Sequence, residues 1–95
     1  MNDIDRTYEQ IIEIARIHDV QELILFGSRA RGDAFEKSDI DLAVKGCLDF
    51  IAFQDDLQEN LWSLLSVDVV DLDAGVSQAL AEDIRRDGKV LYEKI

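Results

Sequence analysis

The sequence predicts a small α/β (α+β) domain in which a small sheet is flanked by helices. Two patterns carry this prediction: in some segments apolar residues recur every three or four positions, and other segments are short apolar runs or strict alternations. The first pattern is typical of amphipathic helices and the second of strands. Because the two patterns mix along one short chain, we expect helices packed on a sheet around a shared core.

These patterns assign seven segments in chain order. Thr7 with Gln10 three residues later resembles a capping box, which would begin the first helix. The first apolar run stops at Gly27, as a buried strand would, and Ser77 and Gly88 would cap and end the last helix. Phenylalanine and leucine residues at spacings of three and four define the longest helix, and a valine-rich run defines the third strand. The expected segments are a helix over 7–18, a strand over 22–26, a turn or short helix with a polar loop over 28–38, a strand over 39–44, a helix over 49–65, a strand over 67–72 and a helix from 77 to 88.

Composition limits what the chain can do. Its 95 residues, 47% of them hydrophobic, suffice for one core, so we expect a single domain over residues 1–95. The net charge of −11 argues against a broad phosphate-binding surface, so direct nucleic-acid binding is not expected. A single cysteine excludes an internal disulfide, and no run approaches the roughly 18 apolar residues of a membrane span. These features predict a soluble cytoplasmic protein.

Two aspartates in the second strand need a physical reason, because carboxylates are depleted in strands and costly near a core. Asp39 and Asp41 alternate with apolar residues, so both side chains would point to one face, with Cα atoms roughly 6.5 to 7 Å apart. Two like charges at that spacing require a cation nearby. Mg²⁺ prefers oxygen ligands and commonly binds through one or two carboxylates together with substrate phosphates. The pair therefore predicts a site for a metal-bound nucleotide.

The turn before the polar loop supplies hydrogen-bond donors for a phosphate. At Gly27 the backbone can approach a phosphate closely, and the hydroxyl of Ser28 and the following N–H groups can donate to its oxygens. Arg29 and Arg31 could neutralise further phosphate charge, or could pair with surface acids instead. Gly27 and Gly32 are spaced as in a P-loop, but the lysine and the hydroxyl residue that a P-loop requires are missing.

The spacing of these residues resembles a known signature. Gly27-Ser28, then ten residues, then Asp39-Ile40-Asp41-Leu42 resembles the nucleotidyltransferase signature of the DNA polymerase β superfamily. The fuller strings Gly-Ser-Arg-Ala-Arg-Gly and Ser-Asp-Ile-Asp-Leu resemble its minimal nucleotidyltransferase (MNT) branch, whose members are about this short. The resemblance implies the nucleotidyltransferase fold with a small mixed sheet.

The same resemblance implies a third carboxylate on a neighbouring strand. The segment 67–73 offers three candidates, Asp68, Asp71 and Asp73. We expect Asp68, because it lies between two valines and repeats the apolar-acid-apolar pattern around Asp41. Asp71 has the opposite parity and remains the alternative.

An activity and a partner are also implied by the resemblance. A hydroxyl would attack the α-phosphorus of ATP, pyrophosphate would leave and AMP would be transferred, with two Mg²⁺ ions and with Asp39, Asp41 and Asp68 as catalytic and metal-binding residues. MNT proteins typically occur with a helical HEPN-domain protein, and in some pairs the MNT antitoxin adds AMP to a tyrosine of its RNase toxin. We therefore expect a nucleotidyltransferase that acts as antitoxin in a hetero-oligomer with a HEPN-domain toxin.

Three other hypotheses stay open. In the first, the acceptor of the nucleotide is a small molecule such as an aminoglycoside. In the second, the chain is a binding module that neutralises its partner sterically, and the two strand aspartates are residual features. In the third, the chain is an unrelated small acidic α/β interaction domain, which would not bind Mg²⁺-ATP.

Overall fold

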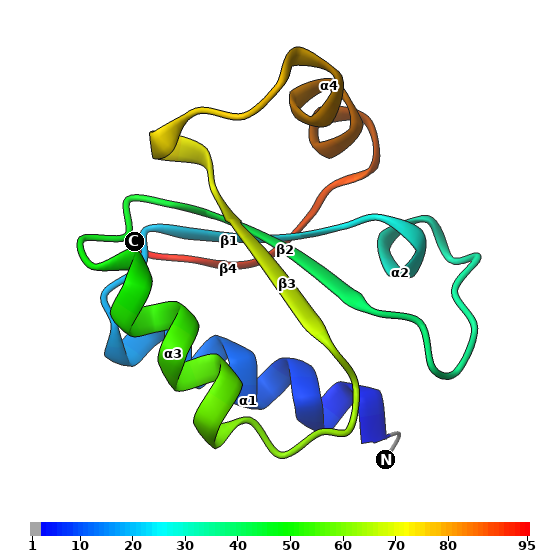
Figure 1. Cartoon of the computed structure of the whole chain (residues 1–95), viewed down its shortest axis with the longest axis horizontal. Helices are drawn as coiled ribbons and strands as arrows, with labels where there is room; N and C mark the ends of the chain where they lie inside the picture. The colour runs from blue at the N-terminus through cyan, green and yellow to red at the C-terminus, as the bar shows by residue number, and fades with distance from the viewer. Residues whose placement is uncertain (1–2) are drawn as a thin grey trace.

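The computed structural model describes residues 3–95, which form a four-stranded sheet with helices on both faces (Figure 1). The elements are α1 (Asp3–Ile17), β1 (Glu22–Phe26), α2 (Ser28–Arg31), β2 (Ile40–Lys45), α3 (Phe50–Asn60), β3 (Val67–Asp71), the short 3₁₀ helix η1 (Leu72–Ala74), α4 (Gln78–Asp87) and β4 (Lys89–Glu93). Within residues 3–95, none of the helices has the length and apolar character needed to cross a lipid bilayer.

The sheet contains both parallel and antiparallel pairs. Its strands lie in the order β3-β2-β1-β4, with β1 antiparallel to β2 and to β4, and with β2 parallel to β3. A parallel pair needs a long connection, and here α3 lies in the segment that joins the end of β2 to the start of β3. The predicted α/β (α+β) class, with a small mixed sheet flanked by helices, is confirmed.

The two faces of the sheet are covered by different helices (Figure 1). The larger core lies between the sheet, α1 and α3, and its largest fully buried side chains are Phe53, Ile11, Leu23, Ile40, Leu42, Leu57, Val20 and Val44. On the opposite face Phe26 and Ala43 pack with Ile84 of α4 in a smaller cluster. Asp41 has the same parity as Ala43 in β2, so its carboxylate lies on the face that α4 covers in part.

The first helix begins earlier than predicted. Since α1 starts at Asp3, Thr7 lies inside the helix, where it is buried, and does not cap it. The side-chain amide of Gln10 donates to the carbonyl oxygen of Asn60 (2.8 Å), and its oxygen accepts from the N–H of Trp62 (2.8 Å). The predicted capping box is therefore wrong, because a contact with a distant segment uses the glutamine.

The longest predicted helix ends five residues early: α3 stops at Asn60, and not at residue 65. The backbone of Leu61 is already extended, with φ −72° and ψ 125°. Because Gln10 of α1 bonds both the carbonyl of Asn60 and the N–H of Trp62, the chain can leave the helix here with these backbone groups satisfied. Leu64, which its spacing assigned to the buried face, is fully exposed.

The strand predictions were right in the interior and wrong by one residue at three ends, one of them the end of β2 at Lys45. The first strand covers 22–26 as predicted, but β2 begins at Ile40, so Asp39 precedes the strand, and β3 ends at Asp71 because Leu72 begins η1. The edge strand β4 was missing from the predicted order. It pairs antiparallel with β1, and its side chains are exposed or only half-buried, which leaves a weak period-two signal.

Both predicted ends of the last helix are confirmed. The hydroxyl of Ser77 accepts a hydrogen bond from the N–H of Leu80 at 3.2 Å, as expected of an N-cap. Helix α4 ends at Asp87, and the N–H of Gly88 donates to the carbonyl of Ile84.

The helix α3 offers a matched test of the larger core. Phe53 is fully buried there, whereas Ile51 on the same helix is 70% exposed. Replacing Phe53 with alanine should lower the free energy of unfolding by about 3–5 kcal/mol, because it leaves a cavity, and replacing Ile51 should change it by less than about 0.5 kcal/mol. Urea denaturation followed by circular dichroism measures both. Equal effects of the two substitutions would contradict the packing described here.

Candidate active site

Asp41 of β2 and Asp68 of β3 are partners in the parallel ladder. Partner residues point to the same face of a sheet, so the two carboxylates are neighbours there. Asp71 is instead the partner of Val44, has the opposite parity, and accepts a hydrogen bond from the N–H of Asp73 (3.0 Å) as the N-cap of η1. The register therefore brings Asp68, and not Asp71, beside Asp41.

Asp73, the third candidate of the segment 67–73, has a structural partner. Its carboxylate accepts a hydrogen bond from the N–H of Gly46, which follows β2, at 2.6 Å. This contact lies beyond the end of β2 that is opposite Asp39 and Asp41. Asp73 thus joins two loops and does not belong to the group around Asp41.

The three predicted carboxylates share one electrostatic environment. The pKa of Asp41 is raised above its usual value, chiefly because partial burial disfavours the charged carboxylate and next because Asp68 and Asp39 repel it. The guanidinium of Arg31 acts in the opposite direction on the same pKa. Asp39 and Asp68 are both exposed to solvent, whereas Asp41 is half-buried. Asp41 is accordingly the member of the group that the fold holds most firmly.

Gly27 lies directly against the carboxylate of Asp41. Its φ is +74°, and a Cβ atom placed on it would lie 2.3 Å from Oδ2 of Asp41, far inside van der Waals contact. The contact follows from strand pairing, because Phe26, the last residue of β1, is the ladder partner of Asp41. The positive φ favours glycine at this position, and a Cβ here would in addition push the Asp41 carboxylate aside.

Helix α2 follows Gly27 at once and provides further donors. The N–H groups of Ala30 and Arg31 donate to the carbonyl of Gly27 (both 3.1 Å), which closes the first turn. The first N–H groups of any helix have no acceptor within it, so those of Ser28 and Arg29 are available to a ligand such as a phosphate. Ser28 is the first residue of α2, and its part in binding a nucleotide stays a prediction.

The two arginines of α2 point to different surroundings. Arg29 donates to backbone carbonyls of the polar loop: its Nε lies 3.1 Å from the oxygen of Ser38, and one terminal nitrogen lies 2.9 Å from the same oxygen and 3.0 Å from that of Glu36. These bonds hold the loop 33–39 against α2. Arg29 could bind a phosphate only by giving up part of this network.

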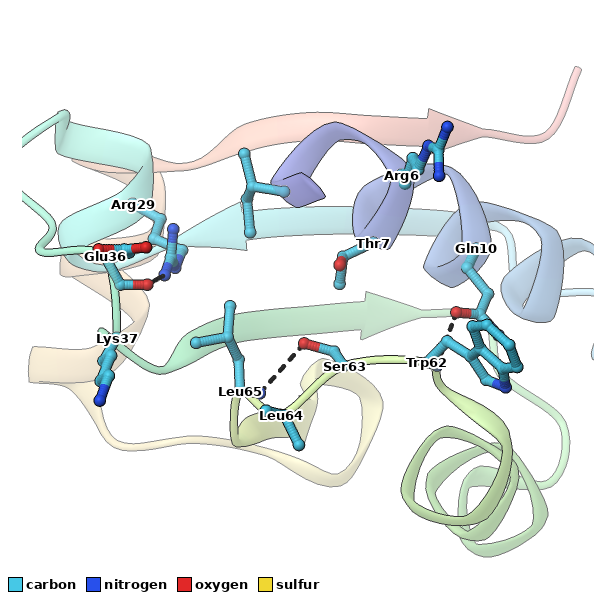
Figure 2. A pocket seen from close by; sticks show the side chains of 11 residues that line it. Arg6, Thr7, Gln10, Arg29, Glu36, Lys37, Trp62, Ser63, Leu64 and Leu65 are labelled. Atoms are coloured by element: carbon cyan, nitrogen blue, oxygen red, sulfur yellow. Dashed lines mark hydrogen bonds between the residues drawn. The ribbon is translucent and has the colours of Figure 1, made fainter. Parts of the chain in front are cut away.

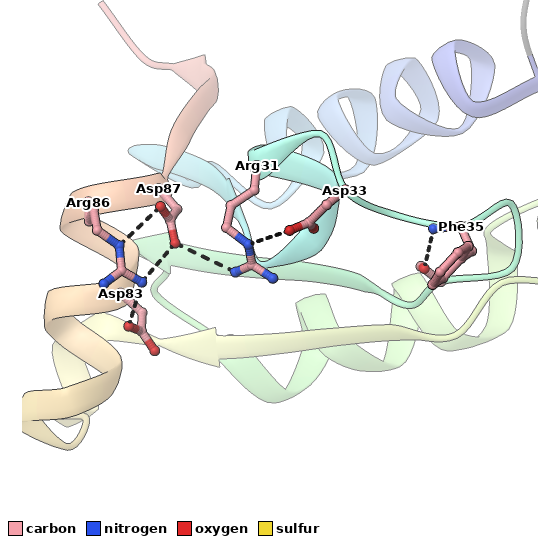
Figure 3. A network of polar contacts seen from close by, with 7 residues as sticks. Arg31, Asp33, Phe35, Asp83, Arg86 and Asp87 are labelled. Carbon is pink, nitrogen blue, oxygen red and sulfur yellow. Dashed lines mark hydrogen bonds and ion pairs between the residues drawn. The ribbon is translucent and has the colours of Figure 1, made fainter.

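Arg31 lies in an ion-pair network with α4 (Figure 3). Its Nε is 3.1 Å from Asp33, and a terminal nitrogen is 3.6 Å from Asp87, whose side chain is only 12% exposed. Arg86 holds the same carboxylate at 3.1 Å and also contacts Asp83 at 3.0 Å. The end of α4 thereby places the Arg31 guanidinium near Asp41. Sequence reasoning missed Asp87, since no motif marks it and only the tertiary fold brings it to Arg31.

The donor set suits a hard divalent cation. As the side chains lie, residues 3–95 include no group of three or more acidic, histidine or cysteine side chains that could hold a metal ion. Asp41 and Asp68 nevertheless offer carboxylate oxygens on adjacent strands, and their repulsion is of the kind that a divalent cation relieves. An ion would be held by this pair and by Asp39, after the two exposed carboxylates had moved toward Asp41.

Comparison with known proteins agrees with the fold and with the signature. Residues 9–95 match the family described as Polymerase beta, Nucleotidyltransferase. A toxin–antitoxin structure with AMP-PNP is similar over 92% of this chain and 73% of its own, with 34% identity and a TM-score of 0.74. A comparison with curated proteins found no match.

Two further solved structures are similar in the same way. A complex of a tri-AMPylated HEPN toxin with its MNT antitoxin, from Shewanella oneidensis, gives 29% identity and a TM-score of 0.66 over 95% of this chain and 72% of its own. The toxin–antitoxin MntA–HepT gives 32% identity and a TM-score of 0.67 over 95% and 73%.

A mixed four-stranded sheet with a glycine turn set against strand carboxylates is the arrangement of a nucleotidyltransferase. The chain belongs to the polymerase β nucleotidyltransferase family. Among solved structures it is similar to minimal nucleotidyltransferases of toxin–antitoxin pairs, as the sequence signature predicted.

The contact between Gly27 and Asp41 can be tested against a second glycine. Gly32 also has a positive φ, +88°, but no atom lies within 4 Å of a Cβ placed on it. Alanine at Gly32, which is in the left-handed α conformation, should destabilise the fold by about 1–2 kcal/mol, and alanine at Gly27, whose ψ of −157° is essentially restricted to glycine, by about 1–3 kcal/mol. Only Gly27→Ala should in addition displace the Asp41 carboxylate. Urea denaturation and the ¹³C shift of the Asp41 carboxyl carbon measure the two effects. An unchanged Asp41 shift in Gly27→Ala would contradict the close contact.

The raised pKa of Asp41 predicts a pH-dependent stability. The folded state binds the Asp41 proton more tightly than the unfolded state does. The free energy of unfolding therefore falls as the pH rises from the unfolded-state pKa of about 3.9 through the raised pKa of Asp41 in the folded state. Asp41→Asn should therefore raise Tm at pH 7, and the gain should vanish below about pH 3.9. Thermal denaturation between pH 3 and pH 7 measures it, with the exposed Asp55→Asn of α3 as the control for removing one negative charge. A lower Tm for Asp41→Asn at pH 7 would refute the repulsion.

Proposed function

We propose that this chain is a metal-dependent nucleotidyltransferase that moves AMP from ATP to a tyrosine hydroxyl of a partner HEPN-domain toxin and thereby acts as its antitoxin. The observation that carries the proposal is the ladder pair Asp41 and Asp68, set against the Gly27 turn at the start of α2. This combination provides carboxylates for a cation and backbone donors for a phosphate at one end of the sheet.

Each residue of the site has a chemical task in this proposal. The N–H groups and hydroxyl of the turn at Gly27 and Ser28 would bind the triphosphate, and Arg31, held by Asp33 and Asp87, would neutralise its charge. Two Mg²⁺ ions, when held by Asp39, Asp41 and Asp68, would supply charge neutralisation at the reacting phosphate. Arg29 would hold the loop that begins after α2 and ends at Asp39.

The reaction is a substitution at phosphorus. The acceptor oxygen forms a bond to the α-phosphorus of ATP as the bond from that phosphorus to the bridging oxygen of the β-phosphate breaks, so pyrophosphate leaves with the electron pair. The exposed carboxylate of Asp68 would take the proton of the attacking hydroxyl. The product is an AMP ester of the acceptor.

The proposed partner and donor are supported by the related structures. One similar toxin–antitoxin structure was determined with AMP-PNP, an ATP analogue, and another contains a tri-AMPylated HEPN toxin with its MNT antitoxin. These statements describe those proteins, and similarity extends them to this chain as a proposal. Transfer of AMP inside a hetero-oligomer would also explain how a small domain meets its acceptor.

The ladder register gives a sharp test of the catalytic residues. Asp68→Asn should lower kcat for AMP transfer by at least about 100-fold, because it removes the proton acceptor beside Asp41. Asp71→Asn, on the same strand with the opposite parity, should keep kcat within about threefold, since asparagine is also a good cap for η1. Transfer of label from α-³²P-ATP with Mg²⁺ to the co-purified partner measures both. Equal losses in the two variants would refute the assignment of Asp68.

The same assay separates the alternatives. If the Asp41→Asn variant transfers no label to the partner but still inhibits it in a stable complex, the chain neutralises its partner sterically and not by transfer of AMP. If label appears on a small molecule such as an aminoglycoside and not on protein, the chain is still a nucleotidyltransferase, but its acceptor is that small molecule. Failure to bind Mg²⁺-ATP in calorimetry would favour an unrelated interaction domain.

A further inference from the structure

The structure has a concave site on the side of α1 and of the segment that follows α3. It is a groove of about 1100 Å³ between the first turns of α1, the loop 33–39 and the segment 61–65 that follows α3, and we name it the Trp62 groove (Figure 2). The side chains that line it are Ile4, Arg6, Thr7, Gln10, Arg29, Glu36, Lys37, Trp62, Ser63, Leu64 and Leu65. The lining includes none of Asp39, Asp41 and Asp68, so the groove is not the candidate active site.

Polar contacts fix both walls of the Trp62 groove. On one side, Gln10 of α1 accepts from the N–H of Trp62 (Figure 2). Gln10 also donates to the carbonyl of Asn60, so the segment after α3 is fastened to α1. On the other side, Arg29 of α2 bonds the carbonyls of Glu36 and Ser38 and holds the loop that carries Lys37. The groove is therefore formed before any ligand binds, which lowers the ordering cost of binding.

The Trp62 groove differs in charge from the rest of the molecule. Three of the ten basic residues of the chain line it, and only one of the 21 acidic residues does, in a protein of net charge −11. Arg6 and Lys37 are exposed, and neither forms an ion pair with any side chain described in residues 4–95. A concentration of positive charge on an acidic molecule selects for a negatively charged ligand.

The groove also exposes large apolar side chains. Trp62 is 90% exposed and Leu64 fully exposed, although both lie in a segment that Gln10 holds in place. Phe35, in the same loop as Lys37, is 84% exposed. Exposed aromatic and aliphatic residues around a cavity are typical of protein-binding sites, and tryptophan is frequent among residues that dominate binding energy.

We propose that the Trp62 groove binds an acidic segment of the partner protein, in which a large apolar side chain enters the groove and flanking carboxylates meet Arg6 and Lys37. Charge and apolar exposure together favour a peptide over a nucleic acid. A polynucleotide would extend past the groove onto a strongly acidic surface, and its phosphates would gain nothing from Leu64 and Leu65. The proposal rests on the proposed function only in that the partner is a protein.

The experiment uses Trp62, the only tryptophan of the chain, as the reporter. The probe is a short synthetic peptide in which leucines alternate with glutamates, titrated without ATP and without Mg²⁺. Binding should shift the Trp62 emission to the blue and reduce its quenching by acrylamide. The double variant Arg6→Glu with Lys37→Glu should weaken this binding about tenfold.

A matched control keeps the total charge of that variant. Lys45→Glu with Arg85→Glu makes the same change at two exposed residues outside the groove, and it should leave the affinity within about twofold. An unchanged Tm in both double variants shows that the fold is intact. The proposal is overturned if both double variants weaken binding equally, if the peptide with lysine in place of glutamate binds as tightly, or if oligouridylate alone shifts the emission. Because no step uses ATP, a loss of transfer activity leaves these results unaffected.

Discussion

The carboxylate of Asp41 lies so close to the backbone of Gly27 that most of the site depends on this contact. Pairing of β1 with β2 places Phe26 opposite Asp41, and the next residue is Gly27, whose positive φ favours glycine and where a Cβ would displace the carboxylate. The same positive φ at Gly27 turns the chain out of β1 and into α2. The conformation of Gly27 therefore sets the position of the turn, and its contact with Asp41 sets the position of the carboxylate beside that turn.

The electrostatic arrangement around Asp41 opposes folding. Asp39 and Asp68 repel the half-buried carboxylate, and Arg31 offsets this only in part. The fold can tolerate the strain because its main core lies on the other face of the sheet, where α1 and α3 bury most of the large apolar side chains. Groups of like charge that the fold keeps together despite their cost are common at sites that bind a cation or perform chemistry.

Local patterns predicted what depends on local physics. The strand 22–26, the Ser77 cap and the parity that favours Asp68 over Asp71 all follow from spacing within a few residues, and the structure has all three. The early end of α3 could not be predicted in this way, because Gln10 of a different helix bonds the backbone there. The contact of Asp87 with Arg31 and the pairing of β4 likewise arise only when distant segments meet.

Strand β3 lies at one edge of the sheet, so Asp68 also affects how this edge can interact with other chains. An edge strand can offer backbone groups for pairing with another chain, and natural proteins often protect such edges with charged side chains. Around Asp68 the strand reads Val67, Val69 and Val70, a β-branched run that favours intermolecular sheets once its charge is gone. A substitution of Asp68 by valine would thus produce four consecutive valines on an open edge. The carboxylate proposed for the site would thus also disfavour edge-to-edge pairing of separate copies of the protein.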